Sequence, residues 1–175
     1  ETTSSLRYIP RMEVWRPCDA TEVSTAWVAA VENLENPTSL VLSRQGTSFI
    51  PRTESQITDI RKGGYVLSDS DGNPDVILIA TGSEVGLAMD SQVALKEGGV
   101  NVRVVSMPCT HAFDRQEKKY QDVVLIPGVK RISIEAGVTD FWRKYVGLDG
   151  ASVGINTYGE SAPGGDLFKH FGFTV

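Results

Sequence analysis

Apolar residues follow a helical period in the first part of the chain. Between residues 19 and 36 they recur three and four positions apart, which places them on one face of a helix. Asp19 and Glu22 have the spacing of a capping box, and Asn36 and Pro37 would end the helix. Flanking strands at residues 12–15 and 39–43 complete a unit that normally closes as a right-handed parallel crossover. The apolar residues of the helix are Val23, Ala26, Trp27, Ala30, Val31 and Leu34.

The periodicity weakens over residues 45–64, where polar residues dominate. This segment is predicted to be a linker with one helical turn near residues 54–60. Beyond it, residues 65–68 and 75–80 flank the turn sequence Asp71-Gly72-Asn73-Pro74. Two apolar runs on either side of such a turn predict an antiparallel hairpin.

The remaining sequence alternates between strand and helix patterns. Strands are expected at residues 75–80, 101–107, 131–135 and 152–155, and helices at 84–97, 114–123, 139–146 and 166–171. Asp114 and Glu117 have the capping-box spacing that would begin the second of these helices. The alternation predicts an α/β fold: a three-layer α/β/α domain whose mostly parallel sheet carries one antiparallel edge strand. We expect a partial β-α-β unit at residues 1–45, a linker at 46–63 and this complete domain at 64–175.

Composition and charge exclude several classes of protein. The chain has 175 residues, of which 41% are hydrophobic and 22% charged, as in ordinary folded proteins. A net charge of -5 without a block of Lys or Arg disfavours nucleic acid as a partner. No apolar run approaches the length of a membrane span and no signal-peptide core is present, so we expect no membrane partner and a cytoplasmic location. Cys18 and Cys109 lie outside metal-ligand spacing and are expected to be free thiols.

Arg44 is the candidate binding residue. It follows the predicted strand at residues 39–43 in the stretch LSRQ. Parallel strands of α/β sheets present ligand sites beyond their carboxyl ends, and a guanidinium there can donate two hydrogen bonds to a phosphate or carboxylate. A surface arginine paired with a nearby acid is the alternative, and spacing alone favours it.

Other chemically interesting residues give weaker signals. Residues 81–84 join a strand to a helix, where backbone amides could bind an anion, although an ordinary N-cap explains them better. His111 and His170 lack partners at metal-ligand spacing, and neither is assigned to catalysis. Glu135 ends a predicted strand, where a structural hydrogen bond is a commoner role than acid–base catalysis.

Longer stretches resemble the carboxyl-terminal part of transketolase, in the family's order and over nearly the whole chain. The resemblance implies that residues 12–43 are the last part of the pyrimidine-binding domain and residues 64–175 the C-terminal domain. It also implies that Arg44 matches the family's sugar-phosphate-binding arginine. The stretches are IPRMEVWRPCDATEVSTAW, PTSLVLSRQ, RKGGYVL, DVILIATGSEV, VRVVSMPCTHAFDRQ, ISIEAGVTDFWRKYVG and YGESAPGGDLFKHFGFT.

The resemblance implies a transferase of the pentose phosphate pathway that moves a two-carbon ketol unit from a ketose phosphate to an aldose phosphate. Family members are homodimers that use thiamine diphosphate and a divalent ion, Mg²⁺ or Ca²⁺. Their cofactor-activating glutamate, reaction-centre histidines and metal ligands would precede Glu1. We therefore expect a fragment that has no catalytic, cofactor-binding or metal-binding residues, binds no cofactor and is inactive alone.

Three questions stay open at this point. A fragment of dihydroxyacetone synthase, a close relative of transketolase, is one alternative. A stand-alone dimerisation or interaction module is another. A regulatory ligand at residues 81–84 is the third.

Overall fold

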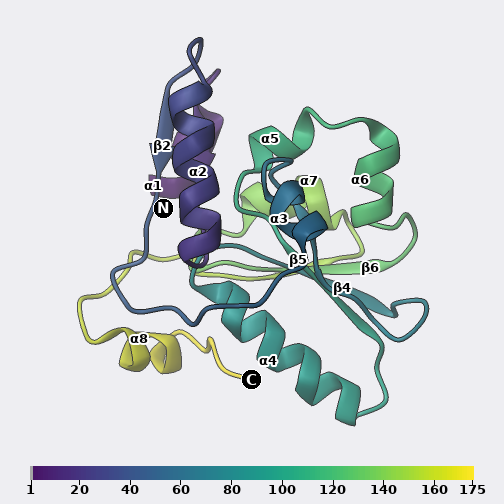
Figure 1. Ribbon diagram of the computed structural model, residues 1–175. Coiled ribbons are helices and arrows are strands. Elements are labelled where there is room, and N and C mark those ends of the chain that lie inside the picture. Colours follow the sequence, from purple (N-terminus) through teal and green to yellow (C-terminus); the bar gives the residue numbers. More distant parts are fainter. Residues whose placement is uncertain (1) are drawn as a thin grey trace.

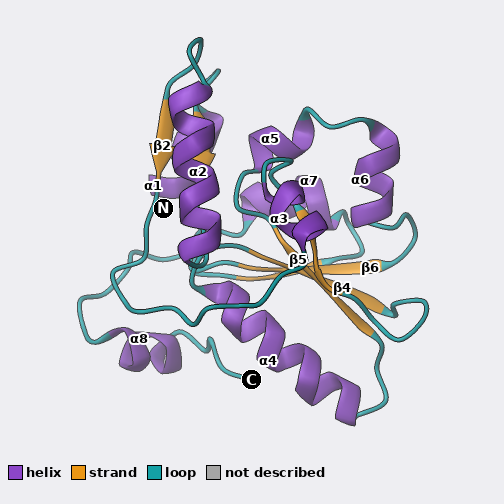
Figure 2. Cartoon of the chain, in the orientation of Figure 1, coloured by secondary structure: helices purple, strands orange, loops and turns teal. Residues whose placement is uncertain are grey.

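In the computed structural model, which describes residues 2–175, a two-stranded sheet with its helices stands beside a larger α/β domain (Figures 1 and 2). The small unit consists of α1 (Thr2–Tyr8), β1 (Glu13–Trp15), α2 (Ala20–Glu32) and β2 (Thr38–Leu40). β1 and β2 pair in parallel, from Glu13 opposite Thr38 to Trp15 opposite Leu40. The predicted β-α-β unit is confirmed.

The larger sheet has the strand order β3-β5-β4-β6-β7. Its strands are β3 (Tyr65–Ser68), β4 (Val76–Ala80), β5 (Val102–Ser106), β6 (Lys130–Ile134) and β7 (Ala151–Val153). Neighbours are parallel except β3, which runs antiparallel to β5 at one edge. A mostly parallel sheet with one antiparallel edge strand is therefore confirmed.

The predicted hairpin between β3 and β4 is wrong. β5 lies between these two strands, so β3 pairs with β5 and the turn at residues 71–74 only connects β3 to β4. Arg103 on β5 donates hydrogen bonds of 2.8 and 3.0 Å to the carboxylate of Asp69, which directly follows β3. This charged contact fastens the end of β3 to β5.

Helices cover both faces of the larger sheet, which confirms the three-layer architecture (Figure 1). α4 lies on one face, where its Val85 and Ala88 pack in one core with Leu78 and Ala80 of β4. α5, α6 and α7 lie on the other face, where Phe113 and other residues pack with Ile77 and Ile79 in a second core. The helices are α3 (Glu54–Ile60), α4 (Glu84–Glu97), α5 (Thr110–Asp114), α6 (Lys118–Val124), α7 (Arg143–Val146), which follows the 3-10 turn η1 (Asp140–Trp142), and α8 (Gly164–His170).

The capping box predicted at Asp114 and Glu117 is wrong. Asp114 is the last residue of α5, and Glu117 precedes α6 without capping it through its side chain. The Asp114 carboxylate instead accepts hydrogen bonds from the Tyr145 hydroxyl at 3.0 and 3.1 Å and from Lys144 Nζ at 2.6 Å. The Asp114 carboxylate, which sequence spacing assigned to a helix start, is thus bound by side chains that are distant in the sequence.

α2 begins as predicted but presents its apolar face to solvent. The Asp19 carboxylate caps the helix by accepting a hydrogen bond from the Glu22 N–H at 3.1 Å. Of the six apolar residues on the predicted face, only Ala26 is buried, whereas Trp27 is 53% and Leu34 92% exposed. The larger domain therefore does not cover this face, and the helix ends at Glu32, earlier than expected.

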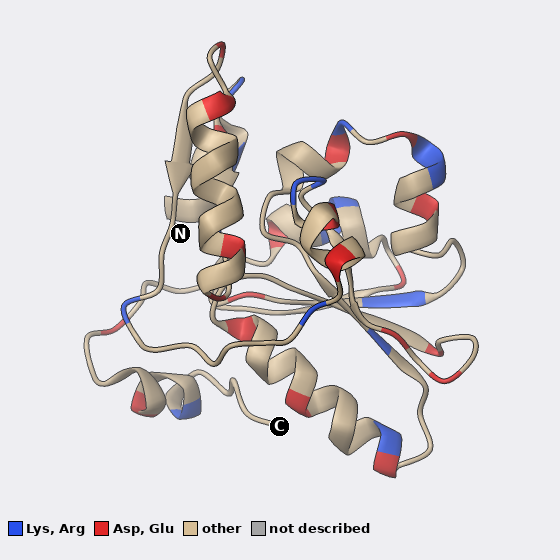
Figure 3. Cartoon of the chain, viewed as in Figure 1, with Lys and Arg blue, Asp and Glu red and all other residues tan. Residues whose placement is uncertain are grey.

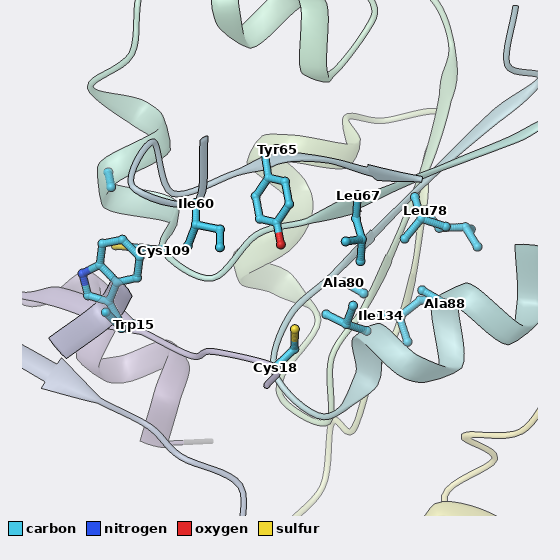
Figure 4. Packing of buried hydrophobic residues seen from close by; sticks show 14 of the residues in the cluster. Trp15, Cys18, Ile60, Tyr65, Leu67, Leu78, Ala80, Ala88, Cys109 and Ile134 are labelled. Carbon is cyan, nitrogen blue, oxygen red and sulfur yellow. The ribbon is translucent and has the colours of Figure 1, made fainter. Parts of the chain in front are cut away.

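A shared hydrophobic core joins the small unit to the larger domain. Trp15, Cys18 and Ala26 of the small unit pack in one buried cluster with Tyr65, Cys109 and other residues of the larger domain. Figure 4 shows the Tyr65 hydroxyl and the Cys18 sulfur directed into the same space between the two units. Apolar packing thus holds the two parts of the chain together.

Candidate functional site

Arg44 lies past the end of β2, in a segment without regular secondary structure that spans residues 41–53. The Val41 N–H donates to the Trp15 carbonyl at 2.8 Å, after which the chain leaves the sheet. Because β1 and β2 are parallel, the start of α2 and the residues after β2 lie at the same edge. Arg44 is exposed and forms no hydrogen bond or ion pair within residues 2–175.

A hollow of about 200 Å³ lies at this edge, and Arg44 itself is not among the residues that line it. One wall is the first turn of α2 with the residues before it, and the other is the segment after β2, including Ser43 and Gln45 on either side of Arg44. The alternative interpretation, in which Arg44 pairs with a nearby acid, is not seen among the described residues. All donors of the Arg44 guanidinium are therefore free of partners within the described residues.

Glu135, directly after β6, is the centre of a buried charge cluster. Arg7 donates two hydrogen bonds to its carboxylate, at 2.7 and 2.9 Å, and Trp142 Nε1 donates a third at 2.7 Å. Arg16 lies 3.4 Å away. Burial would raise the pKa of Glu135, but the charges of the two arginines outweigh it, so the pKa lies below its usual value. Glu135 is therefore an ionised structural group at neutral pH, with its carboxylate already occupied by hydrogen-bond donors.

Arg16 also covers the start of α4. Its guanidinium donates to the Thr81 carbonyl at 2.9 Å and to the Glu84 carboxylate. Glu84 further accepts hydrogen bonds from Ser83 Oγ at 2.6 Å and from the Ala136 N–H at 3.0 Å. Residues 81–84, which the sequence left open as a ligand site, thus face an internal ion pair.

A second buried charge cluster lies where α2 meets the larger domain. Glu22 is fully buried and accepts hydrogen bonds from the Tyr65 hydroxyl at 2.8 Å and from Ser106 Oγ at 2.6 Å. Arg52 lies 2.6 Å from Asp19 and 3.5 Å from Glu22. Burial and the charge of Glu22 raise the pKa of Tyr65 well above its usual range.

Sequence reasoning missed the arginines of both clusters, Arg7, Arg16 and Arg52. Arg16 could have been found, because it directly follows a predicted strand, which is the feature that singled out Arg44. Arg7 and Arg52 give no local signal, since their acidic partners are 128 and 33 residues away in the sequence. Figure 3 shows the basic residues dispersed over helices, strands and loops, so charge patterning does not single out these three arginines.

The histidines and cysteines do not join Arg44. His111 Nε2 lies 3.0 Å from the Arg7 carbonyl, and the exposed His170 packs edge-on against Phe171. Cys18 and Cys109 are free, as expected, and both are buried. Burial raises the pKa of both thiols, that of Cys109 to about 12.

Both thiols are therefore expected to resist alkylation at pH 8 in the folded protein, because the thiolate is the reactive form. Intact mass after treatment with iodoacetamide should show no adduct on the native chain and two adducts after denaturation. Rapid modification of the native chain at either cysteine would contradict the burial seen here.

Metal-ligating side chains do not cluster in the part of the chain that the structure describes. Within residues 2–175, no three His, Cys, Asp or Glu side chains come together in a way that could hold a metal ion. None of the described helices combines the length and apolar character needed to cross a membrane.

Comparison with known proteins identifies the family. The model of the transketolase-like TK C-terminal domain matches residues 63–174, and that of the transketolase pyrimidine-binding domain matches residues 1–48. Transketolase 1 of Vibrio parahaemolyticus is 54% identical over 176 residues, which cover 100% of this chain and 26% of that protein.

Solved transketolase structures share the fold. Transketolase from Leishmania mexicana superposes with a TM-score of 0.91 at 44% identity, over 99% of this chain and 25% of that one. The Pichia stipitis enzyme in complex with sedoheptulose 7-phosphate gives 0.90 at 37% identity, with the same coverage. The chain spans about a quarter of the length of these relatives. Since the matched C-terminal domain alone covers more than half of it, the chain belongs to the transketolase family.

Proposed function

We propose that this chain works as part of a transketolase, a transferase that moves a two-carbon ketol unit from a ketose phosphate to an aldose phosphate. Arg44 binds the phosphate group of the sugar. The observation that carries this proposal is the exposed, unpaired Arg44 beyond the carboxyl edge of β1 and β2, in a segment whose neighbouring residues Ser43 and Gln45 line a hollow. Sedoheptulose 7-phosphate, present in the Pichia stipitis complex, is a ketose phosphate of this kind.

The proposal assigns residues 1–45 to the end of the pyrimidine-binding domain, 46–63 to a linker and 64–175 to the C-terminal domain. The two family matches, at residues 1–48 and 63–174, support this division. Arg44 then lies at the end of the first domain. Its guanidinium can donate two parallel hydrogen bonds to phosphate oxygens, which fixes the direction as well as the position of the sugar.

The complete enzyme is proposed to be a cytoplasmic homodimer that uses thiamine diphosphate with Mg²⁺ or Ca²⁺. Membership of the family supports this, and thiamine diphosphate would supply the carbanion chemistry of ketol transfer. The residues described here do not form a metal-ion site, so ligands for the ion would come from elsewhere in the enzyme. The contribution of this chain is to bind and orient the phosphate end of the substrate.

A chimera tests the function. These 175 residues would replace the aligned segment of the Vibrio parahaemolyticus enzyme. We expect transfer from xylulose 5-phosphate to ribose 5-phosphate at a rate comparable to that of the parent, because the fold and half of the residues are shared. The chain alone, supplied with thiamine diphosphate and Mg²⁺, should show no transfer. A folded chimera that binds the cofactor but lacks activity would overturn the proposal.

Replacing Arg44 by alanine in this chimera is expected to raise the KM for xylulose 5-phosphate by roughly 10- to 100-fold, since a hydrogen bond to a charged group contributes about 1.5–3 kcal/mol. The KM for hydroxypyruvate, a donor without phosphate, should not change. Steady-state kinetics with both donors measure this difference.

Arg143→Ala is the matched control for Arg44→Ala, because Arg143 is also exposed and its side chain forms no hydrogen bond or ion pair within the described chain. It should leave both KM values unchanged. Equal effects of the two substitutions would mean that Arg44 has no specific part in phosphate binding.

A further inference from the structure

The stretch of chain that carries Arg44 is held by hydrogen bonds only at its two ends. At the first end, the Val41 N–H donates to the Trp15 carbonyl. At the second, the Ile50 N–H donates to Asp19 Oδ2 at 3.1 Å. Among the described residues, no hydrogen bond or ion pair holds the stretch between them, residues 42–49, to the rest of the chain. The position of Arg44 therefore depends on these two anchors.

The second anchor is a buried ion pair. Asp19 Oδ2 accepts from Arg52 Nη1 at 2.6 Å as well as from the Ile50 N–H, and the same Arg52 nitrogen donates to the Ile50 carbonyl at 2.8 Å. The two charged side chains are 2% and 1% exposed. The other Asp19 oxygen caps α2. One carboxylate thus joins the start of α2 to the far end of the Arg44 segment.

Arg52 is itself fixed by the larger domain. Its Nε donates to the Tyr65 hydroxyl of β3 at 2.7 Å, and its Nη2 lies 3.3 Å from Cys18 Sγ. Every nitrogen of this guanidinium therefore has a partner. A planar group held in this way has little freedom to move, so residues 50–52 are fixed relative to β3.

We propose that Asp19 and Arg52 are positioning residues for Arg44, because their ion pair fixes the far end of residues 42–49 and thereby sets where the Arg44 guanidinium meets the sugar phosphate. The inference rests on the proposed function of Arg44. Without one anchor, residues 42–49 would sample more conformations. The loss of these conformations on phosphate binding would weaken that binding. Neither residue contacts the substrate in this scheme.

Asp19→Asn separates the anchor from the helix cap. Asparagine caps a helix as well as aspartate does, but it has no charge to pair with Arg52. In the chimera, we expect this variant to raise the KM for xylulose 5-phosphate by roughly tenfold, since small misplacements of a binding group have effects of up to about 10²-fold. The KM for hydroxypyruvate and the kcat should stay unchanged.

A double-mutant cycle distinguishes positioning from a general structural role. When Arg44 is already alanine, adding Asp19→Asn should raise the KM for xylulose 5-phosphate no further, because no guanidinium remains to be positioned. In the 175-residue chain, trypsin should cleave after Arg44 faster in Asp19→Asn than in the wild type, since cleavage reports local opening.

Ser106→Ala is the matched control. It removes a buried hydrogen bond to Glu22 in the same cluster but touches neither Asp19 nor Arg52. It should lower the melting temperature and leave the KM for xylulose 5-phosphate and the rate of cleavage after Arg44 as in the wild type. A rise in either would mean that loss of stability alone explains the Asp19→Asn result, and the inference would be wrong.

The outcomes separate the two proposals. If Arg44→Ala leaves the KM for xylulose 5-phosphate unchanged, the proposed function fails. Suppose instead that Arg44→Ala raises this KM. If Asp19→Asn then leaves it unchanged, or raises the KM for both donors equally, only the positioning role is overturned. Should Asp19→Asn fail to fold, Arg52→Lys replaces it, because lysine keeps the positive charge but lacks the planar set of donors of the guanidinium. That variant should raise the same KM, and an unchanged value would overturn the inference.

Discussion

Replacing Glu135 by glutamine is expected to lower the free energy of unfolding by about 3–5 kcal/mol, the usual effect of removing one partner from a buried ion pair. The side chain of Arg7 is 1% exposed, and that of Arg16 13% exposed. Glutamine has nearly the same shape, so the change leaves two arginine charges buried with less compensation rather than creating a cavity. Urea denaturation at pH 7, monitored by circular dichroism, measures the difference.

Asp71→Asn is the control for the Glu135 substitution. It removes an ion pair with Lys96 in which the two side chains are 69% and 79% exposed, and exposed pairs contribute little to stability. Its denaturation curve should overlay that of the wild type. If Glu135→Gln changed stability no more than this control, the Glu135 cluster would not be holding the small unit on the larger domain.

The contribution of Glu135 should also depend on pH. Its pKa is lowered in the folded chain, so its stabilising effect is present above the pKa of an unfolded glutamate, about 4.3, and is lost as the pH falls through the lower folded value. The difference between the wild type and Glu135→Gln should therefore be constant at neutral pH and shrink below about pH 4. Denaturation at several pH values tests this, and a difference that grew with acidity would contradict the sign.

Gly63→Ala is expected to destabilise the chain by about 4–5 kcal/mol or more, an effect typical of severe steric conflict. Gly63 precedes β3 with a φ of +82°. A Cβ there would lie 2.1 Å from the Cys109 carbonyl oxygen and 2.6 Å from Ala112 Cβ. The first atom belongs to the backbone just before α5 and the second to α5 itself, so relief of the conflict would require the helix to shift. Size-exclusion chromatography and circular dichroism should show an aggregated or unfolded protein.

Gly128 offers a matched comparison, since its φ is +81° and a Cβ added there would meet no atom within 4 Å. Gly128→Ala should lower the free energy of unfolding only by the cost of placing a Cβ on a left-handed backbone, about 1–2 kcal/mol. The difference between the two alanine variants therefore measures the contact between residue 63 and α5. Similar losses from both would mean that α5 can shift.

Local sequence predicted the elements well and the long-range partners poorly. Helix α4 has the predicted bounds, and the glycines that end it, Gly98 and Gly99, directly follow it in the sequence. The pairing of β3 could not be predicted in this way, since hairpin turns and simple connecting turns share the same residues. The contact of Asp69 with Arg103, 34 residues away, distinguishes them only in the folded chain.

Arg16 and Arg44 illustrate the same limit at the site. Each follows one strand of the same small sheet, but Arg16 meets Glu84 and Glu135, which are 68 and 119 residues away in the sequence, whereas Arg44 meets solvent. Sequence spacing could identify the edge of the sheet at which both arginines lie. It could not tell which arginine was already neutralised by the larger domain, because that depends on how the two units pack.

The exposed face of α2 carries a tryptophan whose fluorescence can report whether that face is covered. Trp15 and Trp142 are each 1% exposed, whereas Trp27 is 53% exposed on that face. Only the indole of Trp27 is open to a collisional quencher such as acrylamide, and its emission should lie at longer wavelength than that of the other two. When another domain or chain covers α2, the quenching should fall and the emission shift to the blue, so assembly can be followed without any added label.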